Sequence, residues 1–420
     1  MSDPRPDPLS GSTVPLAGTT VLEIGVFMAA PFAGMQLADL GARVLKVENP
    51  GAPDPVRATG PFLDGPKSAG PNSSGHSSPF ARLNRNKESV ALDLKAPAGR
   101  AAFLRLAATS DAIVENLRPG AMRGLGLDFP AVREVNPGVV YASGSGWGQE
   151  GPLAALPGLD IMAQARGGLM SITGTPDGEP VKVGVPICDL VCGLYLALGV
   201  VAALRERDRS GQGQYLDVSL FESAVSLSVW EAGRYFATGE VGRPLGSAHQ
   251  NQAPYQAVRS ADGWVTIGAI TSKTWAGFCA ALGLDALRDD ERYADAFRRH
   301  AHRTELVATI EQSTTRLSTA QVVDVLDRAG VPCAPIADFA EVFTDTHLHQ
   351  REYFWDAPHP QLGPVRQLGS PMRLSRTPTR RDHAGPALGA DTRSALLGVG
   401  YSAAEVDEMV AVGAAAESTG

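Results

Sequence analysis

The sequence is poor in cysteine, and its few cysteines do not form a recognisable site. They stand at Cys188, Cys192, Cys279 and Cys333, with no Cys-x-x-Cys pair among them. Cys188 and Cys192 lie one helical turn apart, but neither a histidine nor a third cysteine is near them in the sequence. A zinc site or a disulfide framework is therefore not indicated. We expect no metal and a reducing, cytoplasmic setting.

Phosphate-binding glycine motifs and an excess of basic residues are also missing. The 420 residues contain neither a P-loop nor a G-x-G-x-x-G that follows a strand. They carry 37 Lys+Arg against 45 Asp+Glu, a formal net charge of −8. This balance disfavours a general role on nucleic acids or membrane surfaces, so neither is expected as a partner.

No long apolar run is present that is free of charges. The first residues, "MSDPRPDPLSGST", have no apolar core and do not resemble a secretory signal. The most apolar window, 190–204, is about 22 Å long as a helix, which is shorter than the roughly 30 Å of a bilayer core. We expect this window to be a buried helix.

What the sequence does contain is a regular alternation of strand-like and helix-like segments. Strands separated by helices of this length predict βαβ units, and hence a parallel sheet covered on both faces. Ligands of such sheets bind at the carboxyl ends of the strands. The segments are "TVLEIG", "APFAGMQLADLG", "RVLKVE", "SVALDL", "PAGRAAFLRLAATS", "DAIVEN" and "GVVYASGSG".

Two segments interrupt or end this pattern. Residues 49–80 are rich in Pro, Gly and Ser, and their length is typical of a functional lid or of disorder. The last residues, "AAAESTG", are expected to be a frayed tail.

Asp189 is the only charged residue in the apolar stretch "GVPICDLVCGLYLALG". One interpretation is the N-cap of a helix over 190–207, because an Asp oxygen accepts from the N–H groups of the first turn. The other is a reactive carboxylate at the positive end of a helix dipole, where water is scarce. Asp160, in "LPGLDIMAQARGG", allows the same two interpretations. Local sequence leaves both open.

Eight segments in order resemble the family III CoA-transferases, which include formyl-CoA transferase and the α-methylacyl-CoA racemases. The resemblance runs from about Leu16 to Met409. It is carried by "VLEIG…AAPFAGMQLADLGARVLKVENPG", "LNRNKESVALDLKAPAGR", "DAIVENLRPGAMRGLGL", "NPGVVYASGSGWGQEGP", "GLDIMAQARGGLMSITG", "DLVCGLYLALGVVAALRERDRSGQGQYLDVSLFES", "AHQNQAPYQAVRSADGWVTIG" and "AGVPCAPIADFAEVFTD".

The resemblance implies a CoA-transferase in which Asp189 attacks the thioester of an acyl-CoA donor. An aspartyl-CoA thioester forms by way of a mixed anhydride, and a free carboxylic acid then takes the CoA. Asp160 is the second implied catalytic residue. Small dicarboxylic acids such as succinate are common substrates in the wider family. CoA enters as a thioester substrate, and no resident cofactor is implied.

The resemblance also implies the residues that contact CoA. Four basic residues among them, Arg57, Lys95, Arg118 and Arg123, are the candidates for phosphate recognition. Asn49 stands where formyl-CoA transferase has a basic residue, and Gly124 stands where many relatives have arginine, which Arg123 replaces from the next position. The expected contacts are Met28, Ala29, Asn49, Arg57, Leu92, Asp93, Leu94, Lys95, Asn116, Leu117, Arg118 and Arg123.

Two other functions compete with transfer. A racemase of this superfamily uses a histidine upstream of the "GWGQ"-type segment together with the aspartate of a Gly-His-Asp motif. Here that motif reads "GLD", and no histidine occurs between His76 and His249, so a proton-transfer partner for Asp160 is missing. The second alternative is a non-catalytic acyl-CoA-binding protein, which the retained Asp189 and Asp160 disfavour.

The fold implied by the resemblance is α/β: a Rossmann-like domain with a parallel sheet, a second and smaller α+β domain, and an interlocked homodimer. The expected division is a disordered N-terminus (1–13), a large CoA-binding domain (14–206), a linker (207–235), a small domain (236–340), and a return linker with a C-terminal part that packs on the large domain (341–420).

Overall fold

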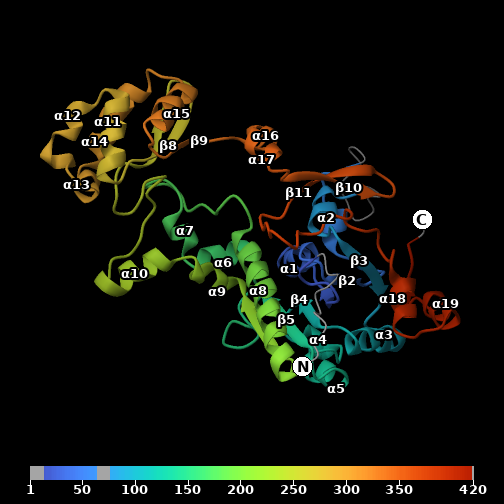
Figure 1. Cartoon of the computed structure of the whole chain (residues 1–420). Coiled ribbons are helices and arrows are strands. Elements are labelled where there is room, and N and C mark those ends of the chain that lie inside the picture. The colour runs from blue at the N-terminus through green and yellow to red at the C-terminus, as the bar shows by residue number, and fades with distance from the viewer. Residues whose placement is uncertain (1–13, 64–75, 419–420) are drawn as a thin grey trace, which may run out of the picture. The chain divides into compact units, whose positions relative to one another are not determined.

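The computed structural model describes residues 14–63 and 76–418, which fall into two compact units (Figure 1). The larger unit holds the described parts of Met1–Leu169 together with Val183–Trp230 and His349–Gly420. The smaller unit holds Met170–Lys182 and Glu231–Leu348. The disorder expected for residues 1–13 and the middle of the expected lid lie outside the described residues.

A seven-stranded sheet forms the centre of the larger unit, in the order β12-β3-β2-β1-β4-β5-β6. All neighbouring strands pair in parallel except β12, which runs antiparallel to β3. Without β12 this is the strand order of doubly wound nucleotide-binding sheets. The predicted parallel sheet is confirmed. Its strands are β1 (Thr20–Ile24), β2 (Arg43–Glu48), β3 (Lys87–Leu92), β4 (Ala112–Glu115), β5 (Val140–Ser145), β6 (Tyr215–Ser219) and β12 (Ala415–Ala416).

The strands are apolar on both sides because helices cover both faces of the sheet. Val21 and Val44 pack toward one core, and their neighbours Leu22 and Leu45 pack toward the other. The first face is covered by α1 (Ala29–Asp39), α6 (Asp160–Arg166), α8 (Ile187–Ser210) and α9 (Leu220–Ser226). The second is covered by α3 (Pro97–Ala108), α4 (Ala121–Gly124), α5 (Phe129–Val135), α18 (Thr392–Gly398) and α19 (Ala403–Ala411).

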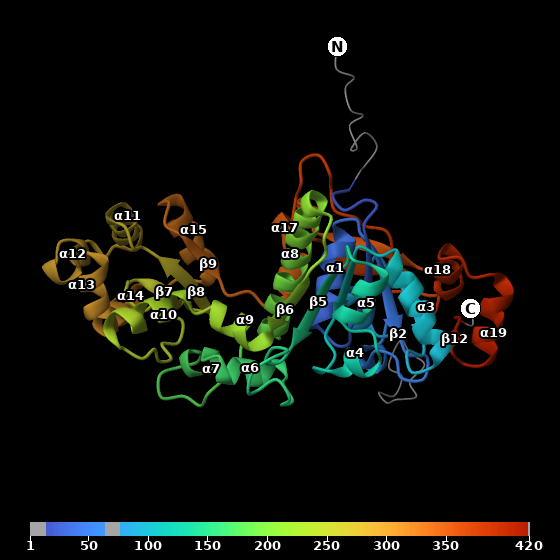
Figure 2. The same ribbon diagram turned by 90° about the horizontal axis from the view of Figure 1, so that it is seen from below.

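Helices α1 and α8 lie side by side over the first face (Figure 2). Gly193 lets them approach closely, because a Cβ there would stand 2.7 Å from the carbonyl oxygen of Ala29. Helix α8 has 24 residues, about 36 Å, so the argument that it is too short to cross a bilayer is wrong. It is the one helix of the described residues that is long and apolar enough to do so, a test that the core helix of a soluble protein also passes.

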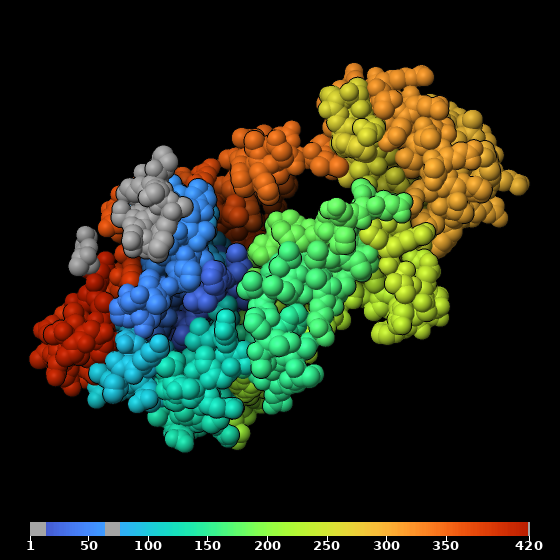
Figure 3. Space-filling model, turned by 180° about the vertical axis from the view of Figure 1, so that it is seen from behind, coloured from blue at the N-terminus to red at the C-terminus, as the bar shows by residue number. Residues whose placement is uncertain are grey.

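The C-terminal residues are built into the larger unit. Figure 3 shows the last part of the chain, in red, against the cyan segment that contains α3. Ala415 and Ala416 pair with β3 as strand β12, and the backbone N–H of Asp93 donates to the carbonyl of Ala414 at 2.9 Å. The expectation of a frayed tail is therefore wrong for the described part of that segment, because β3 offers an open sheet edge that the tail closes.

The remaining elements of the larger unit lie around the expected lid. A hairpin of β10 (Phe354–His359) and β11 (Gly363–Leu368) packs against α2 (Ser78–Leu83), and a short 3-10 helix, η1, spans Pro55–Ala58. The segment 207–235, expected as a linker, contains β6 at the edge of the large sheet and the whole of α9.

The smaller unit is built on a three-stranded antiparallel sheet in the order β7-β8-β9. Its core contains Val258, Ile267, Trp275, Phe278 and Ile310. The elements are α10 (Val229–Thr238), β7 (Tyr255–Arg259), β8 (Trp264–Gly268), α11 (Ser272–Leu282), α12 (Asp285–Arg288), η2 (Glu291–Tyr293), α13 (Ala296–Ala301), α14 (Arg303–Thr314), α15 (Thr319–Arg328), β9 (Cys333–Pro335) and α16 (Phe339–Thr344). Helix α10, whose first two residues belong to the larger unit, and two short helices, α7 (Leu169–Ile172) and α17 (Thr346–Gln350), span boundaries between the units.

Candidate active site

The order of the large sheet reverses between β1 and β4, which is where doubly wound sheets bind ligands. The loops that follow these two strands are joined by the side chain of Asn116. Its amide accepts a hydrogen bond from the backbone N–H of Val26 at 2.9 Å and donates to the carbonyl of Val26, also at 2.9 Å. Two of the predicted CoA-contacting segments, Met28–Ala29 and Asn116–Arg118, therefore leave the sheet side by side.

A cavity of about 190 Å³ opens at the carboxyl ends of β1, β2 and β3. Five of the predicted CoA contacts line it: Asn49, Leu92, Leu94, Lys95 and Leu117. Asp93 lies beside the cavity in a structural role, since its carboxylate accepts from the Asn49 amide at 2.9 Å and from the backbone N–H of Lys95 at 3.1 Å. The wall of the cavity is mostly aliphatic, and it also contains the carboxylates of Glu48 and Asp54 and the exposed Lys95.

A second cavity, of about 300 Å³, is lined by Arg118, the residue that follows Leu117 of the first cavity. Both Arg118 and Arg123 line it, and Arg123 also pairs with Asp128 at 3.2 Å on the surface. Glu115, which the sequence did not single out, lies in its wall. Burial raises the pKa of the Glu115 carboxyl to about 7. The sequence feature that could have identified Glu115 is its position at the carboxyl end of a buried strand.

Arg57, the fourth predicted phosphate ligand, lines neither of these cavities. Its guanidinium binds both carboxylate oxygens of Glu48, at 2.8 and 2.6 Å, and donates to the carbonyl of Pro386 at 3.0 Å. It also lies over the Phe80 ring, 3.8 Å from the centroid. The guanidinium of Arg57 therefore binds other groups of this protein.

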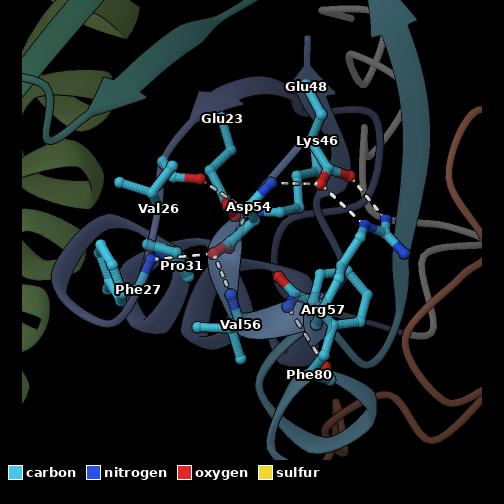
Figure 4. A network of polar contacts seen from close by, with 12 residues as sticks. Glu23, Val26, Phe27, Pro31, Lys46, Glu48, Asp54, Val56, Arg57 and Phe80 are labelled. Atoms are coloured by element: carbon cyan, nitrogen blue, oxygen red, sulfur yellow. Dashed lines mark hydrogen bonds and ion pairs between the residues drawn. The ribbon is translucent and has the colours of Figure 1, made fainter. Parts of the chain in front are cut away.

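Beneath the β1–α1 loop lies a buried network of charges (Figure 4). Glu23 forms ion pairs with Lys46 at 2.9 Å and with Lys87 at 2.7 Å, and Asp54 forms one with Lys46 at 3.0 Å. With Glu48 and Arg57 the network contains three carboxylates and three cations, so it is electrically balanced. Although burial alone would lower it, the pKa of Lys46 is raised by the charges of Glu23 and Asp54.

This network holds the backbone of the loop. Lys46 donates to the carbonyl of Gly25 at 2.8 Å, and Asp54 accepts from the backbone N–H of Phe27 at 3.2 Å. Phe27 has a φ of 60°, a left-handed conformation that a residue with a bulky side chain rarely adopts. The network therefore fixes a strained residue directly before Met28 and Ala29.

The two aspartates at the start of α6 and α8 are in direct contact. The interpretation of each as the N-cap of its own helix is wrong. Helix α8 begins at Ile187 with Pro186 as its N-cap, so Asp189 lies inside the first turn and is not the cap. The side chain of Asp160 caps α8 instead, because it accepts from the backbone N–H groups of Cys188 at 2.8 Å and Asp189 at 3.4 Å. Asp160 does not cap its own helix, in which it is the first residue and Leu159 the N-cap.

Asp189 is half-buried and has no lysine or arginine within ion-pair distance among the described residues. Burial and, to a smaller extent, the nearby negative charge of Asp160 together raise the pKa of its carboxyl to about 7. Gln164 holds the other oxygen of Asp160 at 2.6 Å. The result is a poorly hydrated, basic carboxylate whose ionised form lacks a counter-ion, which is the state of an activated nucleophile.

The first turns of α8 also lie close to the predicted CoA contacts. Gly193 abuts the carbonyl of Ala29, as described above. A Cβ on Gly144 of β5 would stand 3.6 Å from the side chains of both Asn116 and Cys192. Elements that are far apart in the sequence thus bring Asp189, Ala29 and Asn116 to one region of the larger unit.

Known proteins are similar to this chain over most of its length. The family described as CoA-transferase family III matches residues 16–392. The succinate–glutarate CoA-transferase of Agrobacterium fabrum is 36% identical over 89% of this chain and 93% of its own. The succinyl-CoA–D-citramalate CoA-transferase of Chloroflexus aurantiacus is 36% identical over 90% of this chain and 92% of its own.

A solved structure gives the same result. The crystal structure of a CAIB/BAIF family protein from Brucella suis superimposes with a TM-score of 0.81, at 33% identity, over 92% of this chain and 100% of that one. The match in sequence and in structure therefore extends over nearly the whole molecule, and the chain belongs to CoA-transferase family III.

Proposed function

We propose that this enzyme moves CoA from an acyl-CoA donor to a free carboxylic acid through a thioester on Asp189. The observation that carries the proposal is a half-buried carboxylate without a cationic partner, held in the first turn of α8 by a second carboxylate. Loss of hydration strengthens a carboxylate as a nucleophile, and the same shielding protects an anhydride or thioester from water.

The chemistry is balanced without an external acid or base. A carboxylate oxygen of Asp189 attacks the thioester carbonyl of the donor and expels the CoA thiolate, which leaves a mixed anhydride. The thiolate then attacks the Asp189 carbonyl, so that the donor acid departs and an aspartyl-CoA thioester remains. The acceptor carboxylate attacks this thioester and expels the thiolate. The thiolate finally attacks the acceptor's acyl carbon, which releases the new CoA ester and restores Asp189.

Asp160 acts in this scheme as a positioning residue with an electrostatic effect. It orients the first turn of α8 through the N–H groups of Cys188 and Asp189. Its negative charge repels the ionised form of Asp189, and acylation of Asp189 removes that repulsion because the acylated side chain is neutral. Asp160 therefore favours the covalent states over the free carboxylate.

The adenosine and phosphate parts of CoA are assigned to the two cavities at the carboxyl ends of the strands. The smaller cavity, with its mostly aliphatic wall, suits the apolar face of a base, and Lys95 is among its lining residues. Arg118 and Arg123 in the larger cavity are the phosphate ligands that remain after Arg57 is assigned to Glu48. Met28, Ala29 and Asn116 then lie along the path toward Asp189.

The proposed acids are small dicarboxylic acids. The two relatives described above are named for succinate, glutarate and D-citramalate, which are short chains with a carboxylate at each end, and for succinyl-CoA, the CoA thioester of one such acid. We propose a CoA ester of this kind as the donor and a free acid of the same class as the acceptor.

The proposed assembly is a homodimer, for which α8 offers a surface. Its outer side exposes Leu194, Tyr195 and Leu198 to 49%, 41% and 64%. A second copy of the chain is the occupant that we propose for this stripe, because its other side is already covered by α1 and the sheet. The interlocked arrangement implied by the resemblance is part of this proposal.

The test is a substitution that keeps shape and removes the nucleophile. Asp189→Asn should fold and bind CoA but lose transfer by several orders of magnitude, because a neutral amide does not form the anhydride. Wild-type protein mixed with succinyl-CoA should carry a CoA-sized mass adduct on the peptide with Asp189, cleaved by hydroxylamine. Asp208→Asn, at the other end of the same helix, is the matched control and should behave as wild type.

Near-normal transfer by Asp189→Asn, in a preparation free of contaminating enzyme, would contradict the proposal. An adduct that never forms in active wild-type protein would contradict the covalent route. Tight CoA binding without adduct or transfer would favour the non-catalytic alternative.

A further inference from the structure

The smaller unit contains a cavity of about 200 Å³ that the proposed reaction does not use. It lies between α10, the segment 240–250 that follows it, and the junction of α13 and α14. All of its lining residues belong to the smaller unit. Its charged and titratable lining is Glu231, Arg234, Glu240, Arg243, His300 and Arg303.

The cations of this cavity are only partly neutralised. Arg234 is paired with Glu240 through two hydrogen bonds, and Glu231 accepts from the side chain of Gln250. Within the described part of the chain, no carboxylate lies within ion-pair distance of Arg243 or Arg303. The cavity is thus lined by three guanidinium groups and two carboxylates, so one positive charge is not neutralised.

Two nitrogen atoms in the cavity wall have no hydrogen-bond partner. These are Nη1 of Arg303 and Nδ1 of His300, and both are buried. A buried polar group left without a partner costs about 1–3 kcal/mol, more when it is charged, so native proteins seldom contain one without a reason. An anionic oxygen in the cavity would accept a hydrogen bond from Nη1 of Arg303, and from Nδ1 of His300 in the tautomer that carries its proton on that atom.

We propose that this cavity binds the carboxylate group of a small organic acid. The planar guanidinium of Arg303 matches a carboxylate, and the unpaired charge of Arg243 balances it. The site is separate from the proposed thioester chemistry in every residue that forms it. It gives the enzyme a second place that recognises the same chemical class as its proposed acids.

Charge also selects among anions. Burial lowers the pKa of His300, and the charges of Arg303, Arg234 and His249 act in the same direction, which favours the neutral form of His300 in the empty cavity. A single carboxylate then cancels the one spare charge, whereas a phosphate dianion leaves an excess negative charge in a partly buried site. A carboxylate is therefore favoured over phosphate.

The experiment is a titration of the full-length protein, free of CoA, with butyrate, followed by NMR of the His300 imidazole. Butyrate should shift the His300 signals and raise its pKa, and butyramide, which has the same shape without the charge, should not. Arg243→Ala and Arg303→Lys should each weaken butyrate binding about tenfold, by loss of one charge-assisted contact. Arg328→Ala, on the exposed side of α15 in the same unit, is the control and should leave it unchanged.

Equal butyrate affinity in wild type, Arg243→Ala and Arg303→Lys would overturn the proposal. Phosphate binding as tightly as butyrate would overturn the choice of ligand. Arg243 is exposed, so its variant should fold even if that of Arg303 does not. Because binding is measured on unreacted protein, the result is independent of whether Asp189 forms a thioester.

Discussion

At the scale of the residue, the site depends on two aspartates that share one helix terminus. Asp160 occupies N–H groups at the start of α8, so Asp189 in the same first turn has no capping role. A carboxylate that is neither a cap nor part of an ion pair, yet is half-buried, has no stabilising partner among the described residues. Such a costly group is characteristic of functional sites.

The first prediction concerns the pH dependence of transfer. Only the ionised form of Asp189 attacks a thioester, and the pKa of its carboxyl is raised to about 7. Transfer, measured as kcat/KM, should therefore rise with pH through a midpoint near 7 and fall about tenfold per unit below it. Asp160→Asn retains a cap-competent oxygen but removes the repelling charge, so its midpoint should lie at lower pH.

Asp208→Asn is the control for a change of charge on α8, since this residue is exposed about 28 Å further along the helix. Its midpoint should equal that of the wild type. A profile that is flat between pH 5 and 8, or a midpoint that Asp160→Asn leaves in place, would show that Asp189 does not titrate as the structure indicates.

At the scale of the element, the buried charge network connects three strands to one loop. Glu23 lies on β1, Lys46 on β2 and Lys87 on β3, and Asp54 carries the connection to Phe27. Gly34 of α1 leaves room for it, because a Cβ there would stand 2.1 Å from an oxygen of Glu23. Burying six charges is seldom a gain in stability over apolar packing, so the network is better explained by the loop that it positions.

The second prediction follows from removing one cation of the network. Lys46→Met leaves Glu23 and Asp54 with too little positive charge, and should cost about 3–5 kcal/mol in the free energy of unfolding by urea. It also releases Gly25 and Phe27, so the Kd for CoA should rise in the fraction that remains folded.

Arg43→Met provides the matched control, because Arg43 lies on the same strand and pairs with Glu88 at 2.7 Å, but at the surface. This variant should cost less than about 1 kcal/mol and leave CoA binding unchanged. Equal losses of stability in the two variants would show that burial of the network is not what matters, and an unchanged Kd in Lys46→Met would remove its link to the loop.

At the scale of the whole molecule, alternation of strands and helices was enough to predict the parallel sheet, because βαβ units have a local signature. The strand expected over "DAIVEN" ended at Asn116, and β4 ends one residue earlier, at Glu115. Contacts between distant segments could not be read in this way. The cap from Asp160 to Cys188 spans 28 residues, the pairing of Arg57 with Pro386 spans 329, and β12 joins β3 from the far end of the chain. Each of these three contacts depends on tertiary packing, which leaves no periodic pattern in the sequence.

The last prediction concerns assembly, where the apolar side of α8 is the evidence. Leu198 lies in the middle of α8 and is 64% exposed. We expect a second copy of the chain to cover it. Sedimentation of the wild type in dilute solution, without detergent, should show a dimer and no persistent monomer. Leu198→Glu places a charge in the contact and should give monomer or unassembled protein, whereas Leu397→Glu, on the outer side of α18, should remain dimeric. If the two chains are interlocked, mixed dimers of tagged and untagged protein should form only after unfolding and refolding. A stable, active wild-type monomer would contradict the dimer, and rapid exchange of native subunits would contradict the interlocking.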